Sequence, residues 1–440
     1  MDGRNNPRDG NEGIMSNIKM ARTPCAFINS LMVAMAAVST AYAVDFEIPP
    51  EESAAASLPA ELVSGPDFHV REPVQSDGLM HHYVVVSRFG EFAAYGETAL
   101  GVRVREIAAL TKLSKTTDVD VVVGTVSRRV QGDAKTITQV AGHPVKTVVG
   151  IPTGVSHLFH GFKAQASEIS GQVKQPGRSE AGASSPRDLK ADATRYAARY
   201  LGVTAAERRY YQELGVDPYT NNEVLRKTIH HLAKVDATVN LGMHFVGIPG
   251  VPYLGDVKRA MDAIYTEDPA VLRARQRSTL AGFGLTAAEI RRFENTLILS
   301  PTRQSLLIEY AKSLNGVAGR DELFRHAMSV TSDDEMAVFL QSAGLLASVH
   351  AHRPVARIIA GLRLPAAQFA DGGVLVAGAF DAIYWTQDVA SDGAALHALL
   401  PTGSNHLELW ISGAASPQAR SELMTRGWDL HEHAAETPGK

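Results

Sequence analysis

Cysteine is almost absent from this chain. The 440 residues include one, Cys25, which lies inside an apolar N-terminal stretch that we expect to be removed. The mature protein would then have no thiol, which excludes disulfide bonds and cysteine nucleophiles. Its stability must come from the burial of apolar side chains.

An excess of positive charge is also missing. Lys and Arg number 43 against 47 Asp and Glu, so the formal net charge is −4. Proteins that bind nucleic acid usually carry a basic patch, and we therefore expect no nucleic-acid partner. The composition, 45% hydrophobic and 20% charged, is that of a globular protein, and the length suggests two or three domains.

The common catalytic and nucleotide-binding motifs are missing as well. The sequence has no G-x-S-x-G, Walker A, G-x-G-x-x-G or H-E-x-x-H phrase. Three histidine pairs have spacings that could hold a metal: His157 and His160 could share one face of a helix, whereas His350 and His352, or His431 and His433, would share a face only on a strand. We interpret them as ordinary surface histidines and expect no metal and no cofactor. A metal-assisted hydrolase built on these His-rich segments is the alternative.

The N-terminus has the pattern of a signal peptide. Lys19 and Arg22 precede the apolar run PCAFINSLMVAMAAVST, and Ala41-Tyr42-Ala43 supplies the small residues that a signal peptidase reads. We predict a signal peptide over 1–43, cleavage after Ala43 and a periplasmic or secreted protein. An uncleaved anchor is the alternative, and the start codon stays open between Met1, Met15 and Met20. No transmembrane helix is expected in the mature chain.

The segment after the predicted cleavage site divides into three parts. Residues 44–67, rich in Pro, Ala and Glu, predict an extended leader. Residues 68–169 predict an N-terminal α/β unit, with a hairpin over 81–97 that turns near Gly90 and a helix over 100–115. Residues 170–188 are polar and without period, which is typical of a linker.

The middle region, 189–360, predicts a helical domain. Glycines at 202 and 215 end two helical patterns and suit C-terminal caps. Asn222 precedes an apolar stripe and can cap its helix. Two capping boxes, Thr286 with Glu289 and Ser332 with Glu335, predict further helix starts.

The C-terminal region, 361–440, returns to strand-like patterns. A strand, a helix with Pro417 in its first turn, Gly427 and a second strand predict a β–α–β unit. Whether its strands are parallel neighbours is left open. The expected fold class is α+β, with a helix-rich middle flanked by an N-terminal hairpin-plus-helix unit and this C-terminal unit.

One apolar phrase occurs twice, as VVGIPTGV at 148–155 and FVGIPGVP at 245–252. Proline excludes helix at the preceding residue, so each copy is a break that precedes a new helix, the second starting near Asp256. The segments 143–166 and 240–256 are either packed in the core or exposed for binding. The candidate binding residues are apolar: Ile151, Val155, Leu158, Phe159, Phe162, Phe245, Ile248 and Tyr253.

Three phrases carry a resemblance to other proteins. ELGVDPYTNNEVLRKTI at 213–229, TVVGIPTGV and the ending ASPQARSELMTRGWDLHE are similar to a group of uncharacterised exported bacterial proteins that share an LGVDxYxxN phrase. The likeness extends from about Val74 to the C-terminus. It implies neither a fold nor an activity nor catalytic residues. From the residues themselves, Asp217-Pro218-Tyr219 predicts a turn whose tyrosine packs between helices.

The sequence identifies no reaction. Our hypothesis is a non-enzymatic exported envelope protein that uses its apolar Gly/Pro segments to bind a lipid or a protein partner, with its oligomeric state open.

Overall fold

Strand β4 (His81–Ser87) is the centre of the N-terminal sheet. It pairs antiparallel with β5 (Gly90–Tyr95) on one edge and with β2 (Phe68–Val70) and β3 (Gln75–Ser76) on the other. This computed structural model describes residues 46–115, 186–235, 254–401, 403–404 and 406–434. The described residues all belong to one compact unit.

The β4–β5 hairpin confirms the prediction for 81–97. Ser87 pairs with Gly90 at the turn, and Gly90 has a φ of 126°, a conformation that L-residues rarely adopt. Helix α3 (Glu97–Ser114) follows directly and packs on β4 and β5. Its buried face includes Leu100, Ile107 and Leu110, as the apolar spacing predicts.

The described part of the expected leader is not extended throughout. It contains α1 (Ala54–Ser57), α2 (Ala60–Val63) and β1 (Ser64–Gly65), which pairs with β2. The reason is local burial, because Ala54 and Leu62 are buried in the same core as α3 and the Ala54 amide donates to Glu72 Oε1 at 2.9 Å.

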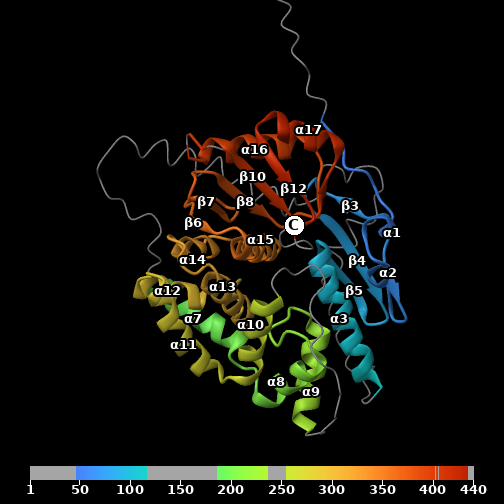
Figure 1. The fold of residues 1–440 in the computed structure, drawn as a ribbon. Helices are drawn as coiled ribbons and strands as arrows, with labels where there is room; N and C mark the ends of the chain where they lie inside the picture. The colour runs from blue at the N-terminus through green and yellow to red at the C-terminus, as the bar shows by residue number, and fades with distance from the viewer. Residues whose placement is uncertain (1–45, 116–185, 236–253, 402, 405, 435–440) are drawn as a thin grey trace, which may run out of the picture. The chain divides into compact units, whose positions relative to one another are not determined.

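The middle region is helical, as predicted. Its helices are α7 (Pro186–Tyr200), α8 (Ala205–Leu214), α9 (Glu223–Val235), α10 (Leu254–Thr266), α11 (Pro269–Gly282), α12 (Ala287–Asn295), α13 (Pro301–Ser313), α14 (Asp321–Ala327) and α15 (Asp333–His352). Figure 1 shows them as the green-to-orange part of the ribbon. Helix α7 begins three residues before the predicted domain start, since a proline suits a first helical turn.

Most predicted caps are confirmed. Thr286 and Glu289 form a complete capping box, and the Leu225 amide donates to Asn222 Oδ1 at 3.1 Å. Gly215 ends α8 with a φ of 67°, whereas Gly202 is not among the described glycines with positive φ.

The second capping box is only half formed. The Ser332 hydroxyl accepts from the Glu335 amide, but Glu335 instead accepts from the Thr331 amide and from Arg363. The cationic partner Arg363 draws the carboxylate away from the position that a capping box requires.

The C-terminal sheet has the order β12-β10-β8-β7-β6. Strands β8 (Val374–Gly378), β10 (Leu407–Ile411) and β12 (Trp428–His431) are parallel, and β7 (Ala366–Phe369) and β6 (Val355–Ile358) continue antiparallel. The two strands of the predicted β–α–β unit are therefore parallel neighbours. The sheet includes β6, which precedes the predicted boundary at 361, because β6 pairs with β7. Short strands β9 (Ala382–Ile383) and β11 (Ala414–Ala415) pair separately.

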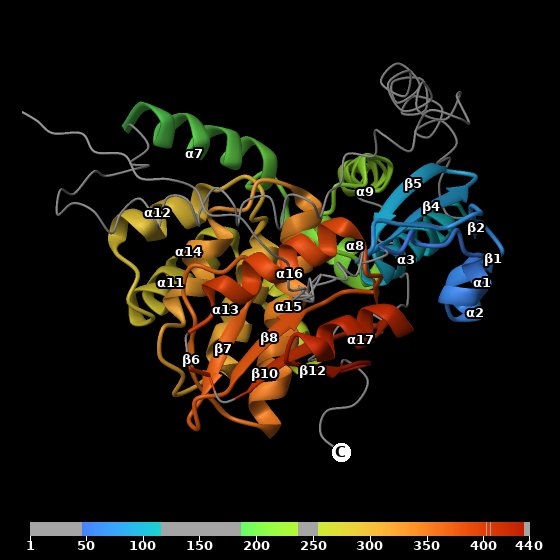
Figure 2. The same ribbon diagram turned by 90° about the horizontal axis from the view of Figure 1, so that it is seen from above.

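Helices cover both faces of the C-terminal sheet. Helix α15 packs on the face that presents Leu375 and Ala377, while α16 (Gln387–Leu399) and α17 (Pro417–Thr425) pack on the face that presents Val376 and Ile411. Figure 1 shows α16 and α17 on one side of this sheet and α15 on the other, and in the view from above in Figure 2 α16 and α17 lie on the viewer's side. The chain is therefore an α+β protein.

One glycine permits α15 to approach α13 closely. A Cβ atom built on Gly344 would lie 3.0 Å from Tyr310 Cζ and 3.2 Å from Tyr310 Oη. Tyr310 is buried, and its ring lies against the α15 backbone because Gly344 has no side chain.

No helix in the described part of the chain combines the length and the apolar character that are needed to cross a bilayer.

Candidate functional site

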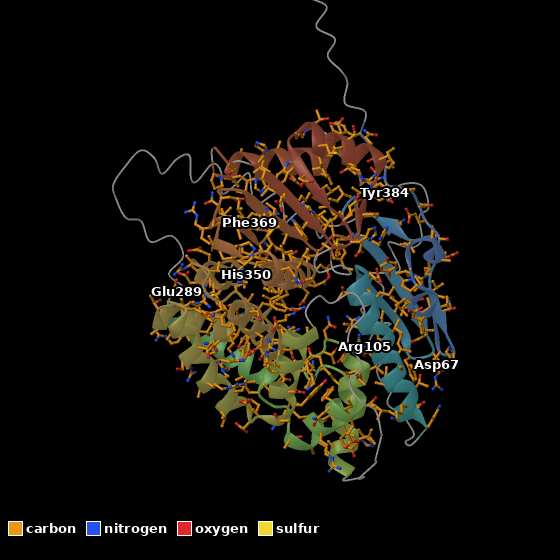
Figure 3. All side chains as sticks on the ribbon, in the orientation of Figure 1. Asp67, Arg105, Glu289, His350, Phe369 and Tyr384 are labelled. Atoms are coloured by element: carbon orange, nitrogen blue, oxygen red, sulfur yellow. The ribbon has the colours of Figure 1, made fainter. Side chains whose placement is uncertain are left out.

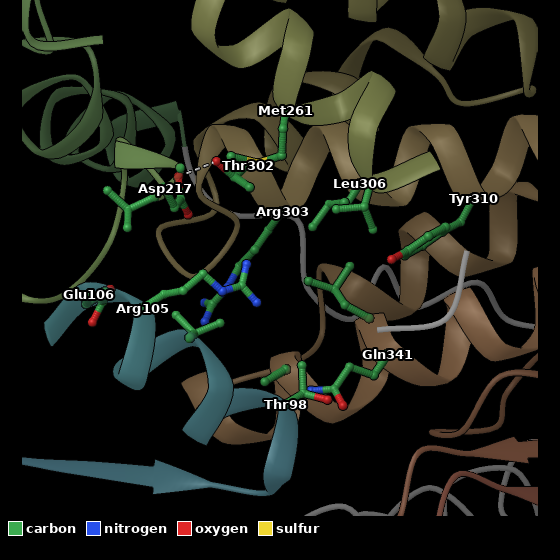
Figure 4. A pocket seen from close by; sticks show the side chains of 16 residues that line it. Thr98, Arg105, Glu106, Asp217, Met261, Thr302, Arg303, Leu306, Tyr310 and Gln341 are labelled. Atoms are coloured by element: carbon green, nitrogen blue, oxygen red, sulfur yellow. Dashed lines mark hydrogen bonds between the residues drawn. The ribbon is translucent and has the colours of Figure 1, made fainter. Parts of the chain in front are cut away.

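A cavity lies where α3 faces the middle helices. Figure 3 shows Arg105 of α3 at this position, and Figure 4 shows the cavity from nearby. Its walls come from α3, the 215–221 loop, α10, α13 and α15. It has two adjoining parts of about 210 Å³ and about 230 Å³, which we call the apolar compartment and the polar compartment.

The apolar compartment is lined mainly by hydrocarbon. Its apolar side chains project from four helices and the loop after α8: Val102, Val216, Val257, Met261, Leu306 and Leu340. Tyr310 and Gln341 add polar atoms to this wall, and Figure 4 shows the Tyr310 hydroxyl directed into the space. Mostly apolar walls with a few polar groups are typical of small-molecule pockets.

Charged side chains gather in the polar compartment and at its junction with the apolar one. Seven residues line both compartments: Thr98, Val102, Glu106, Asp217, Arg303, Ala337 and Gln341. Together the two compartments are lined by four arginines and four carboxylates: Arg103, Arg105, Arg199, Arg303, Glu106, Asp217, Asp333 and Asp334. The charges are balanced when all eight groups are ionised.

Glu106 is a buried carboxylate with a full set of donors. Its side chain is 2% exposed, and it accepts from Arg103 Nη1 at 2.8 Å and from Asn222 Nδ2 at 3.1 Å. The Thr220 hydroxyl donates to its other oxygen. A buried ion requires such compensation, so Glu106 is a structural anchor between α3 and the loop that precedes α9.

Asp217 is held by the turn that the sequence predicts. Its Oδ1 accepts from the Tyr219 amide at 2.9 Å and from the Thr302 hydroxyl at 2.6 Å. Loss of hydration nonetheless raises the pKa of Asp217 above its usual value. Tyr219 packs with Tyr200 of α7 and Ile264 of α10, as expected.

Arg303 lies at the junction of the two compartments. It follows the N-cap Ser300, whose hydroxyl accepts from the Arg303 amide. Its Nη1 donates to Asp333 Oδ1 at 2.5 Å and to the Ile298 carbonyl at 2.7 Å. No other described residue accepts a hydrogen bond from Arg303, so its Nε and Nη2 groups are open to the cavity.

Arg105 brings a second guanidinium group to the same place. Figure 4 draws the Arg105 and Arg303 side chains, which both line the apolar compartment. Burial lowers the pKa of Arg105 from its usual value. Neighbouring cations in a partly dehydrated site favour an anion between them.

The apolar residues that the sequence suggested as binding residues lie outside the part of the chain that the structure describes. Ile151, Val155, Leu158, Phe159, Phe162, Phe245, Ile248 and Tyr253 all lie outside the described residues, as do His157 and His160. The proposal that segments 143–166 and 240–256 form a binding surface therefore stays a prediction. Only the end of the second segment, in α10, is described.

The described histidine pairs have separate local roles. His350 accepts a hydrogen bond from the Val355 amide at 3.1 Å. His431 stacks on Trp410, with ring centroids 4.2 Å apart, and lies 3.7 Å from Glu408. Within the described ranges, no group of three or more His, Cys, Asp or Glu side chains is arranged to hold a metal ion.

Only weak features of the sequence indicate this cavity. Asp217 lies in the LGVDPY phrase, where we predicted a turn but no site. Arg103 and Glu106 are separated by one helical turn, yet Glu106 lies on the buried face of α3, where a carboxylate is expected only with partners. A carboxylate on the buried face of a helix was therefore the one feature that could have indicated the site.

Comparisons with known proteins add no assignment. No protein-family model matches the chain, and neither the curated proteins nor the solved structures contain a match. Any statement of function therefore depends on the geometry of the cavity.

Proposed function

We propose that this protein is a binding protein for a small molecule that has an apolar part and a polar part. The apolar part occupies the apolar compartment against Met261 and Leu306, and the polar part faces the polar compartment. One observation carries this proposal: a space lined by hydrocarbon directly adjoins a space lined by charged groups, and Arg303 and Gln341 line both spaces.

The proposed compartment is the cell envelope or the exterior. The signal peptide over 1–43 and the cleavage after Ala43 stay proposals, as do the periplasmic or secreted location and the envelope partner. Phe46 is the first residue of the compact unit, which agrees with a mature chain that begins at Val44. Edman sequencing of the exported protein tests this: Val44 as the first residue supports the proposal, and a retained Met1, Met15 or Met20 contradicts it.

An uncharged fluorescent probe tests the cavity itself. N-phenyl-1-naphthylamine is apolar and gains fluorescence in hydrocarbon surroundings, so we expect saturable binding at one site. Ala337 lines both compartments from α15, and Ala337→Leu should weaken the probe's affinity by about tenfold because its side chain enters the space.

A matched control lies on the same helix. Ala351 is exposed and does not line either compartment, so Ala351→Leu adds the same side chain without filling the cavity. Equal affinity for the probe in the wild type and both variants would contradict the proposal.

A further inference from the structure

We infer that the ligand of this cavity carries an anionic head group, a carboxylate or a similar small anion, which binds to Arg303 while its apolar chain extends toward Met261 and Leu306. This inference rests on the proposed binding function and specifies the class of ligand.

The first argument is the placement of Arg303. Its two described hydrogen bonds both leave from Nη1, to Asp333 and to the Ile298 carbonyl. These bonds fix the guanidinium plane, while Nε and Nη2 have no described acceptor. A fixed guanidinium edge with two donors is matched by the two oxygens of a carboxylate.

The second argument is the distribution of charge along the cavity. Glu106 accepts hydrogen bonds from Arg103, Thr220 and Asn222, and no described hydrogen bond joins it to Arg303. Asp217 accepts from Thr302 and Tyr219, and no hydrogen bond joins it to Arg303. Asp333 is therefore the one carboxylate in the described structure that accepts a hydrogen bond from Arg303, and the Nε and Nη2 donors of Arg303 have no described acceptor.

The third argument is the position of these two donor groups of Arg303. Arg303 and Arg105 line the same compartment as Val257, Met261 and Leu306, so their guanidinium groups border a hydrocarbon wall. A free inorganic anion would gain nothing from that wall. An anion joined to an alkyl chain would satisfy both surfaces at once.

Three ligands with the same alkyl chain separate the effect of the head-group charge on affinity from the effect of the chain. Octanoate, octan-1-ol and octylammonium each compete with N-phenyl-1-naphthylamine for the wild-type protein. We expect octanoate to displace the probe at a concentration about 10-fold or more below that of octan-1-ol, and octylammonium to be the weakest. Inorganic phosphate tests the free-anion source and should not displace the probe at similar concentrations.

The variant Arg303→Gln should remove the preference of the site for octanoate over octan-1-ol. Arg277→Gln is the matched control, because Arg277 also pairs with a carboxylate, Glu294 at 2.6 and 3.0 Å, but lines neither compartment. Arg303→Lys retains the charge and should retain part of the preference.

Each result has one meaning. Equal displacement by octanoate and octan-1-ol overturns the anionic head group but leaves the proposed binding function intact. Absence of probe binding that responds to Ala337→Leu overturns the proposed function. If Arg303→Gln does not fold, the three-ligand comparison on the wild-type protein still decides.

Discussion

Glu47 and Trp385 are joined by two hydrogen bonds. The Glu47 amide donates to the Trp385 carbonyl at 2.9 Å, and the Trp385 amide donates to Glu47 Oε2 at 2.5 Å. The same carboxylate oxygen accepts from the hydroxyl of Ser416, the N-cap of α17, at 2.6 Å. The segment just after the predicted cleavage site is thus hydrogen-bonded to the segment between β9 and α16 and to the start of α17.

This relationship predicts that Glu47→Ala destabilises the fold. The Trp385 amide and the Ser416 hydroxyl would lose their acceptor, which should cost about 1–3 kcal/mol in the free energy of unfolding. Urea denaturation of the mature chain measures this cost. Glu51→Ala is the control, because Glu51 is exposed and has no described hydrogen bond. Equal midpoints for both variants would show that the Glu47 contacts do not contribute.

Asp217 should make stability depend on pH. Loss of hydration raises the pKa of Asp217 in the folded protein, so between its unfolded and folded values the folded state binds the extra proton. Stability is therefore expected to fall as pH rises through this window. Asp217→Asn retains an oxygen for Tyr219 and Thr302 and should flatten the curve.

Thermal unfolding at a series of pH values tests the role of Asp217. Above the window the Asp217→Asn variant should be at least as stable as the wild type. Asp262→Asn is the control, an exposed carboxylate that pairs with Lys258. Parallel curves for the wild type and Asp217→Asn would contradict the expected titration.

His326 predicts a loss of stability in acid. Burial and the charge of Arg363 lower the pKa of His326 from 6.5 to about 3, and its ring lies 4.6 Å from that of Phe339. Between these values the unfolded chain binds a proton that the folded state does not. Stability should thus fall as pH decreases below the unfolded pKa, by at most about 1.4 kcal/mol per pH unit.

The variant His326→Gln cannot titrate in this range. Its stability should decline less steeply than that of the wild type on acidification, as measured by urea denaturation at several pH values. His397→Gln replaces an exposed histidine and should leave the slope unchanged. A wild-type slope in His326→Gln would assign the acid sensitivity to other groups.

Gly344 predicts a link between packing and binding. Gly344→Ala places a Cβ atom 3.0 Å from Tyr310 Cζ, so the ring must move into the apolar compartment that it lines. We expect a loss of about 1–3 kcal/mol in stability together with weaker probe binding. Gly393→Ala, in α16, meets no atom within 4 Å and should be neutral or stabilising. Unchanged probe affinity in Gly344→Ala would contradict the placement of Tyr310.

Local features of the fold could be predicted from the sequence. The hairpin turn at Gly90 and the caps at Asn222 and Thr286 depend on residues within a few positions of one another. The outcome at Ser332 differs because Glu335 pairs with Arg363, which is distant in the sequence. Local rules do not include such long-range partners.

The cavity could not be predicted for the same reason. Its charged residues come from α3, the end of α7, the loop after α8, the start of α13 and the start of α15, and none of these segments has a site motif of its own. Arg303 follows Pro301 in an ordinary helix start, and it lines a cavity only because α3, α10 and α15 pack around it. Tertiary packing creates this site.

A crystal structure with 8-bromooctanoate tests the central claim most directly, since the anomalous signal of bromine locates the end of the alkyl chain. We predict bromine in the apolar compartment beside Met261 and Leu306, with the carboxylate within hydrogen-bonding distance of Arg303. Bromine at any other position, or a carboxylate that does not contact Arg303, would contradict the account.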